Sequence, residues 1–321
     1  MKLQLKFGLI LSTISLLTFI SYAKAETKVV ASIKPIHSLI SYVMDGVGTP
    51  GLLVDGSSSP HTFQLKPSHA TMLQEADIVF WIGEDLESFL ETPLESIAKD
   101  AKQVTLMESE DIEMLKFREK NVFDDHDDHG DEHDDHDEHG DEHDEHEEHE
   151  EHGDEHDEHE DEHDDHAHHD GHNHGEFDIH FWLDPEIAKT IVQIAAKEIS
   201  EIDPANASKY EANAAKALNK LDQLINDTRG KINKDATYVV FHDAFQYFEQ
   251  RFGIEVIGAL TVNPEILPGA KQLAEIREVI EHEAVNCLFS EPQFNPTIAE
   301  TIASDTGVKT AVLDPLGAEL E

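Results

Sequence analysis

Cysteine and positive charge are both scarce in this chain of 321 residues. The single cysteine, Cys287, excludes any disulfide within the chain. Only 23 Lys and Arg oppose 69 Asp and Glu, which gives a formal net charge of −46 with neutral histidines. A field of this sign repels nucleic acid and anionic membranes and attracts cations. We therefore expect no nucleic-acid partner.

The apolar run near the N-terminus, residues 7–22, is shorter than the about 20 residues that span a bilayer. Lys2 and Lys6 precede it, and an A-x-A cleavage sequence follows at 23–25. This order is typical of a cleaved signal peptide. Because no cysteine near the cleavage point could accept a lipid, the chain is expected to reach the periplasm without a lipid anchor.

Residues 124–175 lack Lys and Arg and contain almost nothing apolar. They hold 17 His and 28 Asp or Glu among 52 residues, in a unit close to acid-acid-His. No helix or strand period can bury such a segment, so the composition predicts disorder. Imidazole and carboxylate are both ligands for divalent metals, and imidazole suits Zn, Cu and Ni. The tract indicates metal handling, as a weak capture site, a sensor or a buffer, or else it is a solvated spacer.

Short β-rich runs alternate with helical patterns on both sides of this tract. This alternation predicts an α/β fold of two lobes, each with a mainly parallel sheet flanked by helices. Strands are expected at 28–33, 51–54, 77–82, 103–107, 236–241, 255–260, 287–290 and 310–313. Helices are expected at 35–47, 67–75, 86–98, 244–251, 268–283 and 296–306.

Between the lobes, residues 204–229 repeat apolar side chains at the helical period, with Asp203 as a cap and Pro204 in the first position. A rigid helix of this length would join the lobes and limit hinge closure. The expected organisation is a signal peptide (1–25), a first lobe (26–123), the His-rich tract (124–175), the end of the first lobe (176–202), the linking helix (203–231) and a second lobe (232–321).

Six histidines lie outside the tract, and three of them follow strands or occupy loops near strand ends. They are His61, His180 and His242, and Asp314 holds an equivalent position after the last expected strand. Ligands of open α/β sheets bind at the carboxyl ends of strands. Three imidazoles and one carboxylate match the tetrahedral preference of Zn²⁺, although these ligand types also allow Mn²⁺.

The remaining three histidines are interpreted differently. His37 is expected to pack or cap in a first helical turn, His69 to be exposed in another, and His282 to be solvated on a helix. Cys287 is expected to be a small buried residue in a strand.

At these residues the chain resembles the metal-binding substrate-binding proteins of ABC transporters, of the cluster A-I type, and most closely their periplasmic zinc branch. The matching segments span almost all of the mature chain: VVASIKPIHSLI, GSSSPHTFQLKPS, ADIVFWIGEDLESFL, DIHFWLDP, YVVFHDAFQYFEQRFG, FSEPQFNP and VLDPLG. Members of that branch commonly carry a His-rich acidic insertion before the segment that matches DIHFWLDP.

The resemblance implies a metal site in the cleft between the lobes. The family's three His ligands match His61, His180 and His242, and the His at the third position favours zinc over manganese. Its acidic ligand matches Asp314, while Pro60 stands where some zinc members carry a Glu. Members continue into a final helix, often with a second cysteine that pairs with the one matching Cys287, so this chain is expected to lack that helix.

The resulting hypothesis is a monomeric periplasmic protein, not an enzyme, that captures Zn²⁺ and delivers it to a cognate ABC permease in the inner membrane. One alternative is a periplasmic zinc buffer or chaperone without a transporter. Another is a zinc hydrolase, because three His with an open position is also catalytic geometry, although no HExxH motif is present.

Overall fold

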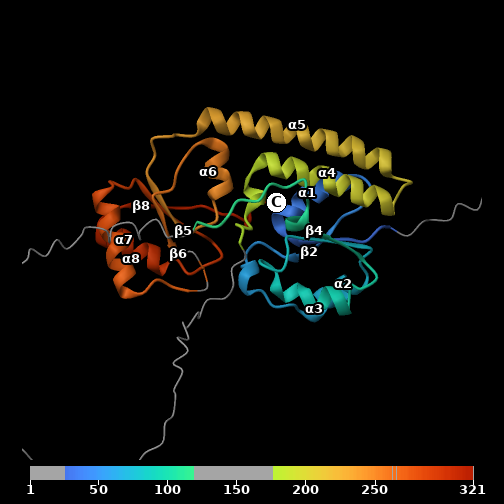
Figure 1. The fold of residues 1–321 in the computed structure, drawn as a ribbon, viewed down its shortest axis with the longest axis horizontal. Coiled ribbons are helices and arrows are strands. Elements are labelled where there is room, and N and C mark those ends of the chain that lie inside the picture. The colour runs from blue at the N-terminus through green and yellow to red at the C-terminus, as the bar shows by residue number, and fades with distance from the viewer. Residues whose placement is uncertain (1–25, 119–175, 262, 265, 321) are drawn as a thin grey trace, which may run out of the picture.

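Each half of the chain builds its own four-stranded parallel sheet, which confirms the predicted fold class (Figure 1). The computed structural model describes residues 26–118 and 176–320, apart from 262 and 265. The first sheet has the order β2-β1-β3-β4 and the second β6-β5-β7-β8. The strands are β1 (Val29–Ile33), β2 (Gly51–Val54), β3 (Ile78–Trp81), β4 (Lys102–Thr105), β5 (Tyr238–His242), β6 (Gly258–Thr261), β7 (Cys287–Ser290) and β8 (Lys309–Val312).

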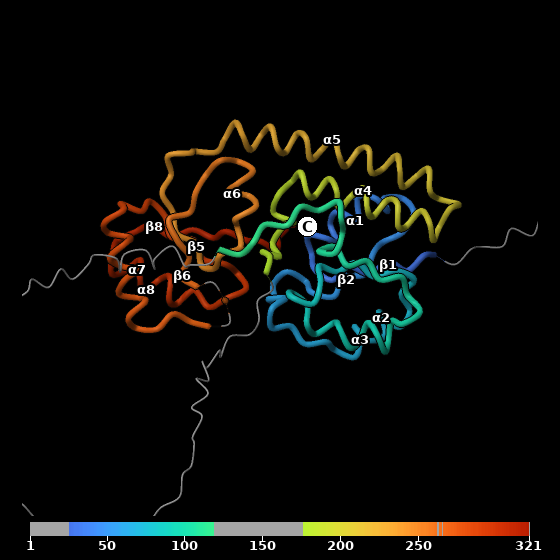
Figure 2. Tube along the Cα trace, in the orientation of Figure 1, coloured from blue at the N-terminus to red at the C-terminus, as the bar shows by residue number. Residues whose placement is uncertain are grey.

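The first sheet is covered by helices on both faces, so its central strands β1 and β3 are fully buried, and all of their residues except Ser32 are apolar. Three helices pack together on one face: α1 (Lys34–Met44), α4 (Pro185–Ile202) and α5 (Ala207–Lys231). The opposite face carries α2 (Pro67–Gln74) and α3 (Glu91–Ser96), as Figure 2 shows.

The second sheet follows the two-residue period of a strand. In β5, Val239 and Phe241 join the core formed with α7 (Ala270–His282) and α8 (Thr297–Thr306), while Tyr238 and Val240 join a cluster on the other face. The helix α6 (Gln246–Phe252) follows β5 directly. Cys287 lies in β7 as expected, but it is only half-buried, and it is a free thiol.

Most expected elements are present with ends shifted by a few residues, and two differ for a reason that the structure shows. The long helix begins at Ala207 rather than Pro204, because Asp203 ends α4 and uses its carboxylate to accept hydrogen bonds from Asn206 and Tyr210. The expected helix 86–98 is split into a 3-10 turn, Ser88–Leu90, and the short α3. The long helix itself has 25 residues, about 37 Å, and it extends beyond α4 toward the second lobe (Figure 1).

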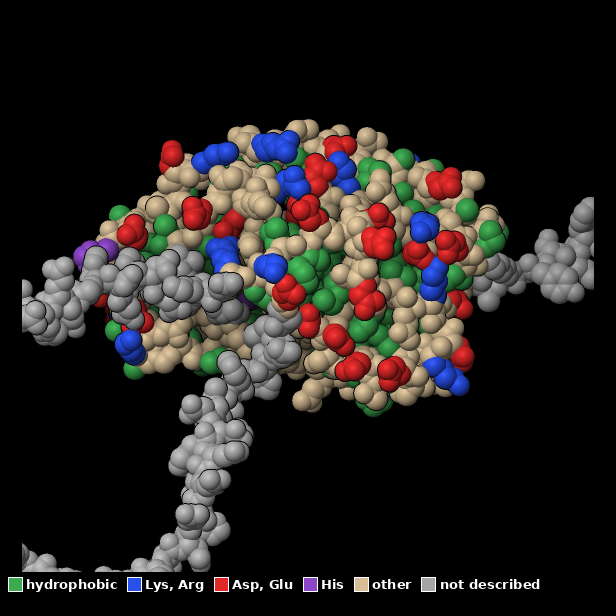
Figure 3. Space-filling view, in the orientation of Figure 1, with side chains coloured by type: hydrophobic (Ala, Val, Ile, Leu, Met, Phe, Trp, Pro, Cys, Tyr) green, Lys and Arg blue, Asp and Glu red, His purple; other side chains and the backbone are tan. Residues whose placement is uncertain are grey.

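The expected signal peptide and the His-rich tract both lie outside the described residues. Within the described part, no helix combines the length and hydrophobicity that crossing a bilayer requires. On the visible face, Asp and Glu side chains are widely spread with Lys and Arg between them (Figure 3).

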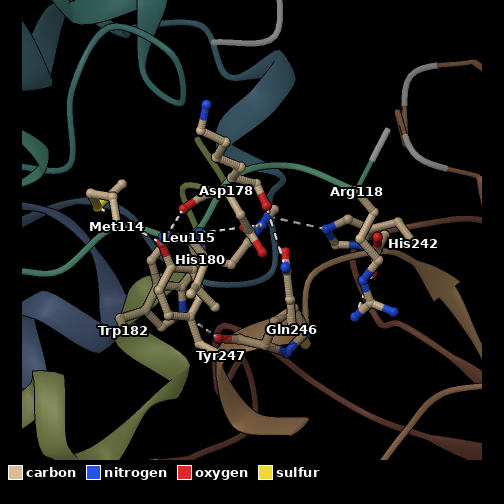
Figure 4. A network of polar contacts seen from close by, with 12 residues as sticks. Met114, Leu115, Arg118, Asp178, His180, Trp182, His242, Gln246 and Tyr247 are labelled. Atoms are coloured by element: carbon tan, nitrogen blue, oxygen red, sulfur yellow. Dashed lines mark hydrogen bonds and ion pairs between the residues drawn. The ribbon is translucent and has the colours of Figure 1, made fainter. Parts of the chain in front are cut away.

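Side chains from the second lobe penetrate the first. Tyr247 of α6 and Leu316 are both part of the first lobe's core. The Tyr247 hydroxyl donates to the carbonyl of Asp178 at 2.7 Å and accepts from the backbone N–H of Leu115 at 2.8 Å (Figure 4). Burial removes competing water from these contacts, so they hold the lobes in one arrangement.

Two ion pairs reinforce this boundary. Arg251 donates from two nitrogens to the two carboxylate oxygens of Asp184, at 2.8 and 2.7 Å, and this two-point match fixes orientation as well as distance. Arg118 Nη2 donates to both oxygens of Glu249 at 2.9 Å and lies 3.4 Å from Asp243.

A buried carboxylate shapes the loop after β3. Glu87 Oε2 accepts from the backbone N–H groups of Ile82 and Gly83, at 2.9 and 3.0 Å. Its side chain is fully buried, and burial raises the pKa of this carboxyl to about 7 in spite of those bonds. Between pH 4.5 and 7 the folded protein therefore binds more protons at this group than the unfolded chain does, and stability falls as pH rises.

We expect Glu87→Gln to remove that dependence. The amide oxygen can keep the two backbone contacts, and the amide nitrogen faces the buried region of Ser32. The variant should gain stability relative to the original protein by up to about 3 kcal/mol near pH 8, with little difference at pH 4. Urea unfolding at several pH values measures this, and a constant difference across the range would contradict it.

Candidate metal centre

Each of the three predicted histidines is positioned by a different backbone element. His61 lies in the 3-10 turn Pro60–Thr62 after β2, and its N–H donates to Ser59 Oγ at 3.3 Å. His180 stands directly before the 3-10 turn Phe181–Leu183, and His242 is the last residue of β5. The first two come from the first lobe and His242 from the second, so the site lies between the lobes.

The three imidazoles converge. One nitrogen from each ring lies within 4.8 Å of the other two, and the ring centroids are 5.1 to 5.9 Å apart. The Nε2 atoms of His180 and His242 are 3.3 Å apart (Figure 4). Two nitrogens bound tetrahedrally to zinc at about 2.0–2.1 Å would be about 3.3–3.4 Å apart. The spacing of this pair therefore suits one shared ion.

Two carboxylates that the sequence analysis missed orient these rings. His180 Nδ1 contacts Asp178 Oδ1 at 2.8 Å, and His242 Nδ1 contacts Glu291 Oε1 at 2.7 Å. A carboxylate on Nδ1 holds the proton there, which leaves Nε2 as the free donor to a metal. Two sequence features could have indicated these carboxylates: Asp178 lies two residues before His180, and Glu291 begins the EP dipeptide after β7. Only the packing shows which ring each carboxylate contacts.

Burial and charge shape the titration of this site. His180 and His242 are 4% and 3% exposed, and Asp178 and Glu291 are 1% and 3% exposed. Burial raises the pKa of Asp178 to about 7, although the His180 N–H opposes this shift. Burial lowers the pKa of His242, but the carboxylates of Glu291, Asp243 and Asp178 together more than offset it, so that the pKa is raised overall.

Negative charge exceeds positive charge around the rings. Asp178, Asp243 and Glu249 are buried close to a single guanidinium, Arg118, and Glu291 lies behind His242. Burial raises the pKa of both Asp243 and Glu249, while Arg118 lowers them. A bound cation would balance this excess.

The space between the rings is small. The cavity measures about 10 Å³, roughly the room that one water molecule or ion needs. Its walls come from both lobes. Besides the three imidazoles, the lining includes the apolar side chains of Pro60, Trp182, Phe294, Pro315 and Leu316 and the polar side chains of Ser59, Glu291 and Gln293. Trp182 also ties the lobes together, because its indole N–H donates to the carbonyl of Pro315 at 3.0 Å.

Asp314 lies outside the group of converging nitrogens, so the structure does not support its predicted role as fourth ligand. Both of its carboxylate oxygens are engaged in the loop after β8. Oδ1 accepts from the backbone N–H of Leu316 and from Gln293 Nε2, and Oδ2 accepts from the N–H of Ala318. Asp314 thus shapes the turn that brings Leu316 against the first lobe.

The other three described histidines lie outside the cluster as well. His37 Nε2 contacts the Pro50 carbonyl at 3.0 Å, which fits the expected packing role. His69 is only partly exposed, because it stacks on Phe63 and its Nδ1 accepts from the N–H of Lys66. His282 is exposed on α7, as expected.

The fold and the site together define a two-lobed α/β protein with a histidine centre between its lobes. The model of the family "zinc-uptake complex component A periplasmic" matches residues 29–321. The chain is 46% identical over 303 residues to the high-affinity zinc uptake system protein ZnuA of Brucella abortus (strain 2308), which covers 94% of this chain and 87% of that protein. It is 35% identical to the high-affinity zinc uptake system protein ZnuA of Yersinia pestis, and the match covers 92% of this chain and 84% of that protein.

A crystal structure of ZnuA shares the fold with a TM-score of 0.69 at 22% identity, covering 91% of this chain and 92% of that chain. A zinc-bound ZnuA deletion mutant gives a TM-score of 0.66 over the same shares. The chain belongs to the family of periplasmic A components of zinc-uptake complexes.

The Glu291 contact generates a prediction for the titration of His242. In Glu291→Gln the largest raising influence is lost, while burial still lowers the pKa and Asp243 and Asp178 still raise it, so the pKa should fall. NMR titration of the metal-free protein measures this. The exposed Glu281→Gln serves as a control that leaves the His242 pKa unchanged. A pKa that does not fall in Glu291→Gln would contradict the assigned role.

Proposed function

We propose that this protein captures Zn²⁺ between its lobes and delivers it to an ABC-type zinc importer. The observation that carries the proposal is the convergence of His61, His180 and His242, with carboxylates behind two of the rings. Neutral imidazole is a preferred ligand of zinc, and three imidazoles with one further position fit its tetrahedral geometry. The family membership supplies the context of zinc uptake.

The dimensions of the cavity favour capture over catalysis. The room of about 10 Å³ between the rings suits a single ion or water molecule, which supports capture. A zinc hydrolase would need an open coordination position in contact with its substrate. We therefore assign no catalytic residues.

The remaining parts of the proposal concern organisation and partners. The protein acts in the periplasm as a monomer after removal of residues 1–25, and its partners are a permease and its ATPase. The described residues divide into a first lobe that ends near 202, the linking helix at 203–231 and a second lobe from 232. The His-rich residues 124–175 bind further Zn²⁺ weakly and are not part of the tight site.

Loss of a ligand should abolish tight binding. Replacing His61, His180 or His242 singly by Ala should weaken Zn²⁺ binding by more than the about 100-fold that losing an outer partner can cost. Competition with a chelating dye measures the affinity, and the exposed His282→Ala is the matched control. Unchanged affinity in the single variants would overturn the ligand assignment.

Deleting residues 124–175 should separate the two kinds of binding. Titration of the shortened protein should lose the weak sites and keep one tight site, since the three ligands lie outside the deleted segment. The weak binding in the original protein should also fade as pH drops through about 6–7, where imidazole protonates. Loss of the tight site on deletion would refute this division.

Delivery distinguishes uptake from buffering. Vesicles that contain the permease and ATPase should accumulate Zn²⁺ only when the zinc-loaded protein is added. Accumulation at the same rate from free Zn²⁺ would favour the alternative of a periplasmic buffer.

A further inference from the structure

Gln293 lies on the cavity wall and has no role in the site as described so far. It follows β7 by three residues and lines the same cavity as the three histidines. Its amide nitrogen Nε2 donates to the carbonyl of Gly56 at 2.7 Å and to Asp314 Oδ1 at 2.9 Å. Gly56 belongs to the first-lobe loop that leads to His61, so Gln293 connects the lobes at the site.

These two contacts determine which way the amide points. A carbonyl oxygen and a carboxylate oxygen only accept hydrogen bonds, so the NH₂ group must face both of them. The reverse orientation would place oxygen against oxygen at two positions. The amide oxygen Oε1 is therefore directed away from Gly56 and Asp314.

That oxygen is buried, and no donor among the described residues reaches it. Buried amide oxygens almost always accept a hydrogen bond, because losing water without a replacement destabilises the fold. A second such acceptor, Glu291 Oε2, is also on the cavity wall. Glu291 contacts Nδ1 of His242, however, and so lies behind that ring, on the side opposite the converging Nε2.

We infer that Gln293 is a positioning residue for the fourth coordination position: its Oε1 accepts a hydrogen bond from a water molecule bound to the captured Zn²⁺. This inference rests on the proposed function. The same amide keeps Asp314 engaged in its turn, so the residue that supplies the acceptor also holds the carboxylate away from the ion. Because Gly56 comes from the first lobe, the acceptor is in place only when the two lobes meet.

Cobalt makes the inference measurable, since Co²⁺ in place of Zn²⁺ has visible bands and an EPR signal that respond to its ligands. In water enriched in ¹⁷O, the EPR signal of the Co²⁺-loaded full chain should broaden, because the fourth ligand is water. An unbroadened signal would overturn the inference, since a protein group would then fill that position. The full chain is loaded with less than one equivalent of Co²⁺, so that the tight site fills before residues 124–175 bind the ion.

Two substitutions test whether Gln293 acts as a hydrogen-bond acceptor at the site or only as a contact between the lobes. Gln293→Met keeps the length but removes donor and acceptor; it should shift the cobalt bands and weaken Zn²⁺ binding by about 10-fold to 100-fold. Arg251→Met removes a different contact between the lobes, the ion pair with Asp184, and keeps the Gln293 amide, so its cobalt bands should stay near those of the original protein. The exposed Gln74→Met is the matched control.

Equal band shifts in Gln293→Met and Arg251→Met would overturn the acceptor role and leave Gln293 only a contact between the lobes. If the Zn²⁺ affinity and the cobalt bands are both unchanged in Gln293→Met, Gln293 is neither an acceptor at the site nor a contact that zinc binding needs. Neither result touches the proposed function, which fails only if the three histidine variants keep tight Zn²⁺ binding.

Discussion

The burial of two imidazoles and several carboxyl groups at one boundary, with a third imidazole half-buried beside them, is the constraint on which the structure depends. His180, His242, Asp178 and Glu291 are all nearly inaccessible to water. Burying ionised groups is unfavourable unless opposite charge lies close by, and Arg118 compensates only part of the nearby negative charge. In the proposed function a dication supplies the rest, which links closure of the boundary to the capture of its ligand.

The two sheets provide the positions for this arrangement. In a parallel sheet all carboxyl ends lie at one edge, and the loops that follow the strands collect there. His61 follows β2 and His242 ends β5, so each sheet contributes from that edge. His180 enters from a segment between the sheets, supported by Asp178. Tyr247 and Leu316 then keep the edges together, because both are buried in the first lobe's core.

Much of the fold could be predicted because it depends on local patterns. The strands VVASI and IVFW are short apolar runs, and the long helix repeats its apolar residues every three to four positions. Its first residue was misplaced because Asp203 serves the end of α4 instead of the start of α5, a choice made by its contact with Tyr210. The helix expected at 86–98 was interrupted because Glu87 turns inward to bind the backbone of residues 82 and 83.

The sequence by itself determined which chemical groups are available, namely imidazoles near strand ends and an excess of acidic side chains. It also determined the α/β alternation that gathers the strand ends at one edge of each sheet. Only the tertiary structure decided how those groups are used. Glu291 is 49 positions away from His242 in the sequence, yet it contacts the ring of that histidine. Asp314 also has the chemistry of a metal ligand, but its carboxylate shapes a turn instead. Local patterns describe covalent neighbours, whereas hydrogen-bond partners follow from how two separately built lobes pack against each other.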